Sequence, residues 1–270
     1  MKLKFDSKFI SLLLMLILVI TIVHPIGLPV QVSKMTRGSY DLIENLPEGS
    51  LVVYFNDASV GGWASVQWLS IAVLQHMMQR PIKIVILTCI VGGEMSVFLT
   101  EDYLLPKVDI GGKEYGVDYV HLGFIPGAEI TVASLAEDVH KLLVTDYRGN
   151  MIDDLPIMDE FKNWEDIDLV FTNGGTLLQS YVRQLYVPYN IQIIGGVQGT
   201  SIQLYMPYYE GGQIAGMLCD IKAAGEYELL MGKPSGAIKF SDLLSIAYLL
   251  MIGIIIVGNV QDLIARKEET

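Results

Sequence analysis

The sequence predicts an α/β protein whose mostly parallel, doubly wound sheet of about five strands is flanked by an N-terminal and a C-terminal transmembrane helix. Three observations lead to this fold class. An uncharged apolar stretch lies near each end of the chain, short apolar runs of the buried-strand type lie between them, and helical patterns alternate with those runs. Strands that alternate with helices form βαβ units, and these units build parallel sheets.

The predicted strands are residues 50–55, 82–91, 118–124, 167–172 and 190–195, and the predicted helices are residues 64–79, 130–143, 176–186 and 212–230. The run 82–91 is continuously apolar, as in a strand that is covered on both faces of a sheet. This order favours a Rossmann-like architecture. The predicted organisation is a tail and signal anchor (1–30), an α/β domain (31–238), a transmembrane helix (239–262) and a charged tail (263–270).

Composition supports a globular domain tied to a membrane. The 270 residues are 51% hydrophobic and 18% charged, with a formal net charge of −12, and the mean hydropathy is +0.43. Soluble domains carry about 25% charged residues, so the chain is too apolar for a soluble domain alone and too charged for a multi-spanning transporter. Abundant aromatic and branched residues exclude disorder. The absence of clustered Lys and Arg argues against nucleic acid as a partner.

The N-terminal stretch, residues 9–23, is uncharged but shorter than the about 20 residues of a typical transmembrane helix. Lys2, Lys4 and Lys8 precede it as in a secretory signal, whereas a small-residue cleavage pattern is missing around residues 23–27. These features favour an uncleaved signal anchor over a removed signal peptide.

The C-terminal stretch, residues 243–260, is uncharged and long enough for a transmembrane helix. A buried core helix is the alternative. The flanking Lys and Arg are slightly more frequent on the terminal tails than on the inner flanks, and the domain carries the negative charge. We therefore expect a two-pass protein of the cell membrane with an extracytoplasmic domain and both termini in the cytoplasm.

Glycine and small polar residues follow every predicted strand. In an open parallel sheet these loops meet at the carboxyl edge, where ligands of doubly wound proteins bind, although glycine also suits tight turns for structural reasons alone. The predicted ligand-binding residues are Asn56, Ser59, Gly61, Gly62, Gly92, Gly93, Gly127, Asn173, Gly174, Gly175, Thr176, Gly195 and Gly196. None of these loops has the spacing of a dinucleotide fingerprint or a P-loop.

Catalysis has weaker support. Asp57 and Glu94 are the best candidates for a general acid or base, because their loops converge at the same edge; solvated loop carboxylates are the alternative interpretation. Cys89 and Cys219 lie far apart and predict two inert thiols. No cofactor and no metal site is predicted. The acidic residues 153–168 predict a solvated surface, with a partner-binding face or weak calcium site as the alternative.

Small residues recur at helical spacing in residues 212–230, the predicted helix before the membrane segment. They are Gly212, Ala215, Gly216, Cys219, Ala223 and Ala224. A flat stripe of this kind packs on the sheet or on a second copy of the chain. We expect self-association through the transmembrane helices and the Gly212–Ala224 helix, and other membrane proteins as further partners.

Several motifs resemble a group of uncharacterised prokaryotic membrane proteins. They are residues 118–124 with Pro126 and Gly127, residues 145–149, residues 212–218, residues 223–228 and the following apolar helix that ends at Asn259. The likeness spans residues 117–260. It implies an anchored α/β architecture and no particular activity.

The sequence thus predicts a membrane-anchored, non-catalytic α/β module that binds a partner protein or a small ligand, within an oligomeric membrane complex. The alternative is a membrane-associated hydrolase or transferase with its site at the carboxyl edge of the sheet. A scaffold that holds membrane proteins together is a lesser hypothesis.

Overall fold

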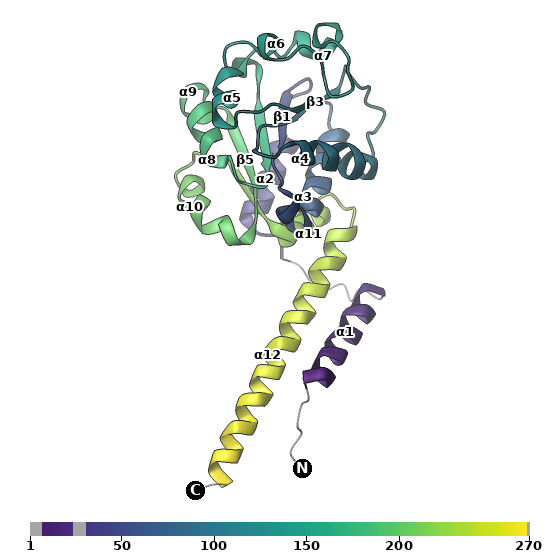
Figure 1. The fold of residues 1–270 in the computed structure, drawn as a ribbon, viewed down its shortest axis with the longest axis vertical. Helices are drawn as coiled ribbons and strands as arrows, with labels where there is room; N and C mark the ends of the chain where they lie inside the picture. The colour runs from purple at the N-terminus through teal and green to yellow at the C-terminus, as the bar shows by residue number, and fades with distance from the viewer. Residues whose placement is uncertain (1–6, 24–30, 269–270) are drawn as a thin grey trace.

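The structure is a computed structural model that describes residues 7–23 and 31–268, with side chains described for residues 10–21 and 31–260. An α/β domain stands on the long helix α12, and the shorter helix α1 lies beside α12 (Figure 1). The cleavage region that the sequence analysis considered lies mostly outside the described residues.

The sheet contains six parallel strands in the order β3-β2-β1-β4-β5-β6. This is the strand order of the Rossmann fold, in which the direction of strand succession reverses between β1 and β4. The strands are β1 (Leu51–Asn56), β2 (Lys83–Thr88), β3 (Tyr119–Phe124), β4 (Leu169–Asn173), β5 (Gln192–Val197) and β6 (Gly216–Cys219). The predicted fold class is confirmed, with one strand more than expected.

Helices cover both faces of the sheet. One face packs against α2 (Lys34–Glu44), α3 (Val60–Gln79) and α11 (Asp220–Leu230). The helical segments of the other face and the edges are α4 (Glu94–Phe98), η1 (Leu99–Leu104), η2 (Leu105–Lys107), α5 (Glu129–Ser134), α6 (Val139–Leu142), η3 (Ile152–Asp154), α7 (Pro156–Asp159), η4 (Trp164–Asp166), α8 (Leu178–Tyr181), η5 (Val182–Tyr186), α9 (Val187–Tyr189), η6 (Gly199–Ser201) and α10 (Ile202–Glu210). The remaining helices are α1 (Ser7–Val23) and α12 (Gly236–Glu268).

The predicted helix over residues 212–230 is wrong in its first half, because Gly216–Cys219 forms the edge strand β6. Gly216 pairs with Ile194 of β5, and a Cβ atom at this position would lie 2.6 Å from the Ser39 hydroxyl of α2. The glycine therefore lets α2 pack directly on the strand. The Gly212–Ala224 helix, with its stripe of small residues, does not exist as one helix face.

Two further boundaries differ from the predictions. The apolar run 82–91 forms a strand only to Thr88, so Cys89 lies buried just beyond the end of β2. The predicted helix 130–143 is divided into α5 and α6, because Asp138 adopts an extended conformation and caps α6 by accepting a hydrogen bond from the His140 N–H at 3.0 Å.

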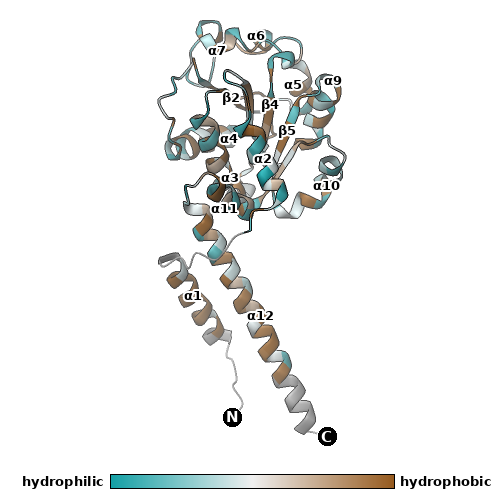
Figure 2. Ribbon diagram, turned by 180° about the vertical axis from the view of Figure 1, so that it is seen from behind, coloured by the Kyte–Doolittle hydropathy of each residue, from teal (hydrophilic) through white to brown (hydrophobic). Residues whose placement is uncertain are grey.

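Only one of the two predicted transmembrane helices has the required length within the described part of the chain. Residues 236–260 of α12 are long and apolar enough to cross a membrane, whereas the apolar part of α1, Ile10–Thr21, is shorter than a span. The hydropathy colouring shows the apolar residues concentrated on α1, α12 and the sheet (Figure 2). The expectation of two spanning helices is therefore corrected to one candidate span. α12 continues to Glu268, so most of the predicted charged tail 263–270 lies within this helix.

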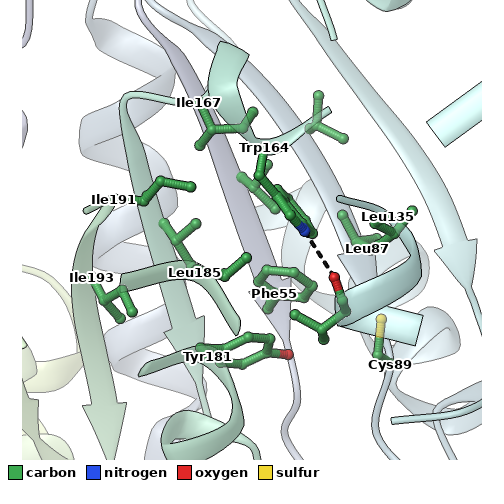
Figure 3. Packing of buried hydrophobic residues seen from close by; sticks show 14 of the residues in the cluster. Phe55, Leu87, Cys89, Leu135, Trp164, Ile167, Tyr181, Leu185, Ile191 and Ile193 are labelled. Carbon is green, nitrogen blue, oxygen red and sulfur yellow. Dashed lines mark hydrogen bonds between the residues drawn. The ribbon is translucent and has the colours of Figure 1, made fainter. Parts of the chain in front are cut away.

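The acidic segment 153–168 exposes its carboxylates, as predicted, and buries its apolar side chains in the core. Trp164 is fully buried beside Phe55, with ring centroids 6.2 Å apart, and its Nε1–H donates to the Val132 carbonyl at 2.8 Å (Figure 3). The segment thus closes the core at the amino edge of the sheet. Within the described residues, no three His, Cys, Asp or Glu side chains are arranged to hold a metal ion.

We expect Trp164→Phe to destabilise the domain by about 1–2 kcal/mol, because the buried Val132 carbonyl loses its indole donor. Urea unfolding monitored by far-UV circular dichroism measures the change. An unfolding midpoint equal to that of the wild type would contradict the role assigned to this hydrogen bond.

Candidate functional site

The first candidate site lies where β1 and β4 end side by side, at the point where strand succession reverses. Ligands of doubly wound proteins bind outside the carboxyl ends of the strands at such a point. Asp57 follows β1 directly, and its backbone N–H donates to the Asn173 carbonyl of β4 at 2.9 Å. Its side chain is fully buried, with 0% exposure. Asp57 therefore has the expected place in the topology but does not face solvent.

The Asp57 carboxylate accepts hydrogen bonds from three hydroxyl groups. Thr88 donates to Oδ1 at 3.0 Å, and Thr172 and Tyr181 donate to Oδ2 at 3.2 and 2.5 Å. Burial raises the pKa of Asp57 to about 6, although the hydrogen bonds oppose this rise. The interpretation of Asp57 as a solvated loop carboxylate is wrong, and as a general acid or base it lacks direct access to a substrate.

Glu94, the other candidate acid or base, is exposed at the first residue of α4. Gly93, which precedes it, is buried where a Cβ atom would clash with the Phe124 ring. Since Asp57 is buried and Glu94 faces solvent, the two carboxylates do not line one common space. The structure does not assemble them into an acid–base pair.

Asn56 and Asn173 are the last residues of β1 and β4 and are paired in the sheet register. Both side chains are buried. The Asn56 amide donates to Thr100 Oγ1 at 2.8 Å, and the Asn173 amide donates to Ser70 Oγ of α3. In the described part of the chain neither Oδ1 atom has a hydrogen-bond partner. Their predicted contact with a ligand stays a prediction, because both lie below the surface.

Most of the predicted glycines have a packing role where they are buried. Gly174 has a φ of +109°, and a Cβ atom there would collide with the Asp57 carbonyl, so glycine is required for the close approach of the two loops. Gly195 and Gly196 lie inside β5 and not in a loop; a Cβ atom on Gly195 would lie 2.8 Å from Leu178. Buried glycine in a strand indicates close packing of a helix on the sheet.

The other predicted ligand-binding residues are distributed between a helix cap and the surface. Ser59 caps α3 by accepting from the Gly62 N–H at 3.2 Å, which is the structural alternative for hydroxyls at helix starts. Gly175 is buried, and Tyr205 donates to its carbonyl at 2.5 Å. The exposed residues of the set are Ser59, Gly61, Gly92, Gly127 and Thr176. The contact of these exposed positions with a ligand stays a prediction.

A second candidate site was missed by the sequence analysis. A cavity of about 640 Å³, here called the α12 pocket, lies between the β6 side of the domain and the first turns of α12. It is lined mostly by apolar surface. The lining residues are Ser33, Met35 and Thr36 of the α2 start, Ser65 of α3, Ile202 of α10, Met217 and Cys219 of β6, Asp220, Ile221, Lys222, Ala223 and Glu226 of α11, and Ser241, Leu244, Ser245 and Tyr248 of α12.

Asp220 lies in this pocket at the carboxyl end of β6. Its φ of +53° is unusual for a residue with a side chain. Oδ2 accepts from the Gly199 N–H at 2.6 Å, and the buried Oδ1 has no partner among the described residues. Burial raises the pKa of Asp220. Such strained residues persist only where surrounding structure holds them, and they concentrate at functional sites.

Glu226 forms the polar wall of the pocket. Its side chain is only 1% exposed, and Oε2 accepts from the Ser33 N–H at 3.0 Å, the Ser33 hydroxyl at 2.7 Å and the Thr36 hydroxyl at 2.5 Å. The exposed Lys222 ammonium lies 3.8 Å from Oε1. The carboxylate thereby fixes the start of α2 against α11 and gives the pocket one rigid polar side.

The cysteine of the pocket is not activated. Burial raises the pKa of Cys219 to about 11, and burial also raises the pKa of Cys89. Because the thiolate is the reactive form of cysteine, both residues are poor nucleophiles near neutral pH. This chemistry suits a binding pocket better than a site of covalent catalysis.

The fold and the pocket together describe a doubly wound α/β protein with a ligand-sized cavity beside a candidate membrane helix. No protein-family model, curated protein or solved structure matches the chain. The resemblance to uncharacterised prokaryotic membrane proteins therefore stays a prediction, and the function is argued from the site alone.

Proposed function

We propose that this protein is a membrane-anchored, non-catalytic α/β module that binds a small ligand in the α12 pocket. The observation that carries the proposal is the pocket itself: about 640 Å³ of space at the carboxyl end of β6, with a mostly apolar lining surface and the charged side chains of Asp220, Lys222 and Glu226 in its walls. Ligand sites are concave cavities of roughly 300–1,000 Å³ with this kind of lining. Five helices and one strand contribute to the walls.

Three features support binding rather than catalysis. The Cys219 thiol is held protonated by burial, and the Glu226 carboxylate is occupied by Ser33 and Thr36. The buried Asp57 carboxylate is enclosed by its own hydroxyl donors. A general base must reach a substrate proton to within hydrogen-bond distance, and neither buried carboxylate has a free approach.

The alternative, a membrane-associated hydrolase or transferase, rests on Asp57. A buried carboxylate with a raised pKa at the strand reversal point is the kind of group that active sites use. That role requires an opening between β1 and β4 that exposes the carboxylate to substrate.

We also propose two parts of the expected membrane arrangement as part of this function: the domain on the extracytoplasmic side and self-association through α12. Gly253 and Gly258 of α12 have open space around them, which allows a second helix to approach closely. A single cysteine at exposed Glu48 in a Cys89→Ser, Cys219→Ser background tests the side. Labelling of this cysteine in intact cells supports an extracytoplasmic domain, and labelling only after permeabilisation contradicts it.

The pocket is tested with Ser245→Trp, which places an indole inside it, and with Leu249→Trp, which adds the same group to α12 at an exposed position outside it. Native mass spectrometry of the full chain from mild detergent is expected to show a bound molecule of defined mass. That molecule should be retained by Leu249→Trp and lost from Ser245→Trp. A wild-type spectrum without bound molecule, or equal retention by both variants, contradicts the proposal.

A further inference from the structure

We infer that the ligand of the α12 pocket is a membrane phospholipid, which enters sideways from the bilayer and places an acyl chain between α12 and the domain. This inference rests on the proposed function and names the ligand class. It depends on the depth of the pocket relative to the membrane, on its lining and on the charges around its mouth.

The depth follows from the length of the candidate span. Between Asp242 and Asp262 the sequence of α12 is uncharged, and at 1.5 Å per residue this stretch covers about 28 Å. The hydrocarbon core of a bilayer is about 30 Å thick. The whole stretch is therefore needed to cross it, so the hydrocarbon boundary lies close to Leu243.

The pocket overlaps the beginning of this span. Leu244, Ser245 and Tyr248 of α12 line it together with domain residues such as Ser65 and Ile221. Residues 243–248 cover about 8 Å of helix. The domain walls of the pocket consequently lie at the depth of the lipid head groups and the first acyl carbons. Tyr248 is 58% exposed at this level, where amphipathic aromatic side chains are favoured.

The orientation of the domain agrees with this depth. Helices α6 and α7 lie at the end of the domain opposite to α12 (Figure 1), and α7 belongs to the amino edge, since the Ile157 N–H bonds to Gly116 just before β3. α12 therefore extends away from the domain on the side where the carboxyl ends of the strands lie. α3 begins at this carboxyl edge, so Val60, five residues before Ser65 and 63% exposed, lies about 7 Å farther along α3 toward that edge than Ser65.

The lining and the charges select an amphiphile. Met35, Ile202 and Met217 give the interior its apolar surface. Although the chain carries a net charge of −12, the side of the pocket toward α2 and α11 exposes basic residues: Lys34 and Arg37 in the first turn of α2 and Lys222 in α11. Basic side chains next to a membrane attract anionic head groups. A phospholipid would place an acyl chain against the apolar interior of the pocket and its phosphate near the Lys222 ammonium.

The test uses the full chain in vesicles of equal parts phosphatidylcholine and phosphatidylglycerol that contain phosphatidylglycerol with a diazirine at the end of one acyl chain. After irradiation, mass spectrometry maps the cross-linked residues. We expect cross-links on Met217, which is 1% exposed and lies in the pocket wall. Ser245→Trp should reduce them about tenfold, equivalent to a loss of about 1.4 kcal/mol in binding free energy, and Leu249→Trp should leave them unchanged.

Lys222→Ala is a second variant that does not depend on filling the pocket, because this side chain is exposed and the substitution adds no bulk. It should reduce cross-linking by the phosphatidylglycerol probe more than by the matching phosphatidylcholine probe. Cross-links confined to α1 and the exposed face of α12, with a bound molecule still present in the native mass spectrum, would overturn the lipid inference and leave the proposed function standing. Absence of both the cross-links and the bound molecule would overturn both.

Discussion

Replacing Glu228 with alanine is expected to destabilise the domain and its attachment to α12 by about 3–5 kcal/mol. Glu228 lies in α11 and is only 3% exposed. Its carboxylate accepts from the Ser235, Ala237 and Ile238 N–H groups at 2.8, 3.0 and 3.2 Å and from the Ser235 hydroxyl. The substitution leaves these donors at the start of α12 without this acceptor, and each buried donor that loses its acceptor costs about 1–3 kcal/mol.

The change is measured as a melting temperature of the full chain in detergent, where 3–5 kcal/mol corresponds to a decrease of roughly 6–20 °C. Hydrogen exchange of the Ala237 and Ile238 amides should become faster as well. Glu228→Gln keeps one acceptor oxygen and should lose less than half as much stability. Glu210→Ala, at an exposed glutamate, is the control. A melting temperature within 2 °C of the wild type for Glu228→Ala, on the same scale, would show that α12 is held by other contacts.

This network gives α12 a fixed direction relative to the sheet. Gly236, at the start of α12, packs against the Trp68 ring so closely that a Cβ atom would clash, and Phe240 lies 5.2 Å from the same ring. Because the first turns of α12 pack beside α11 and α3, the pocket between them is a built part of the fold. A flexible linker in this place would leave no defined cavity.

The sheet could be predicted from the sequence because β1 to β5 are apolar runs bounded by polar and glycine residues. β6 could not, because Gly216–Cys219 is a four-residue edge strand within small residues that also fit a helix. α2 was missed although its sequence carries a signal, because Met35, Leu42 and Ile43 recur at helical spacing and only the buried Thr36 and Ser39 weaken that pattern.

The two candidate sites differ in how much of each could be predicted from the sequence. The position of Asp57 after β1 was predictable, but its burial was not, because Thr88, Thr172 and Tyr181 lie 31, 115 and 124 residues away in the chain. The α12 pocket had no local signal at all. Its walls come from segments that only the folded chain brings together. Among the glycines that suggested a ligand cradle, Gly174 and Gly195 lie where a Cβ atom would collide with a neighbouring segment.

Asp57 is expected to make the stability of the domain fall as the pH rises from about 4 to about 6. Burial raises the pKa of Asp57 from 3.8 to about 6, so within this window the native state keeps a proton that the unfolded chain has lost. A difference of about 2 pKa units corresponds to a stabilisation of the native state by roughly 3 kcal/mol at low pH, and this stabilisation is fully lost above pH 6. Carboxylates with a lowered pKa, such as Glu101 and Asp146, act in the opposite direction and mask this effect in the wild type alone.

The comparison with Asp57→Asn isolates the contribution of this one group. The amide cannot ionise, so the free energy of unfolding of the variant minus that of the wild type should increase by roughly 2–3 kcal/mol between pH 4 and pH 6 and stay constant above it. The altered hydrogen bond to Tyr181 also changes the stability of the variant by a constant amount. This constant shifts the difference between the two free energies of unfolding equally at every pH and does not change its slope against pH. Asp41→Asn, at an exposed carboxylate, should show no such rise. A flat difference for Asp57→Asn would mean that water reaches this carboxylate, and the enzyme hypothesis would then gain the access that the closed structure denies it.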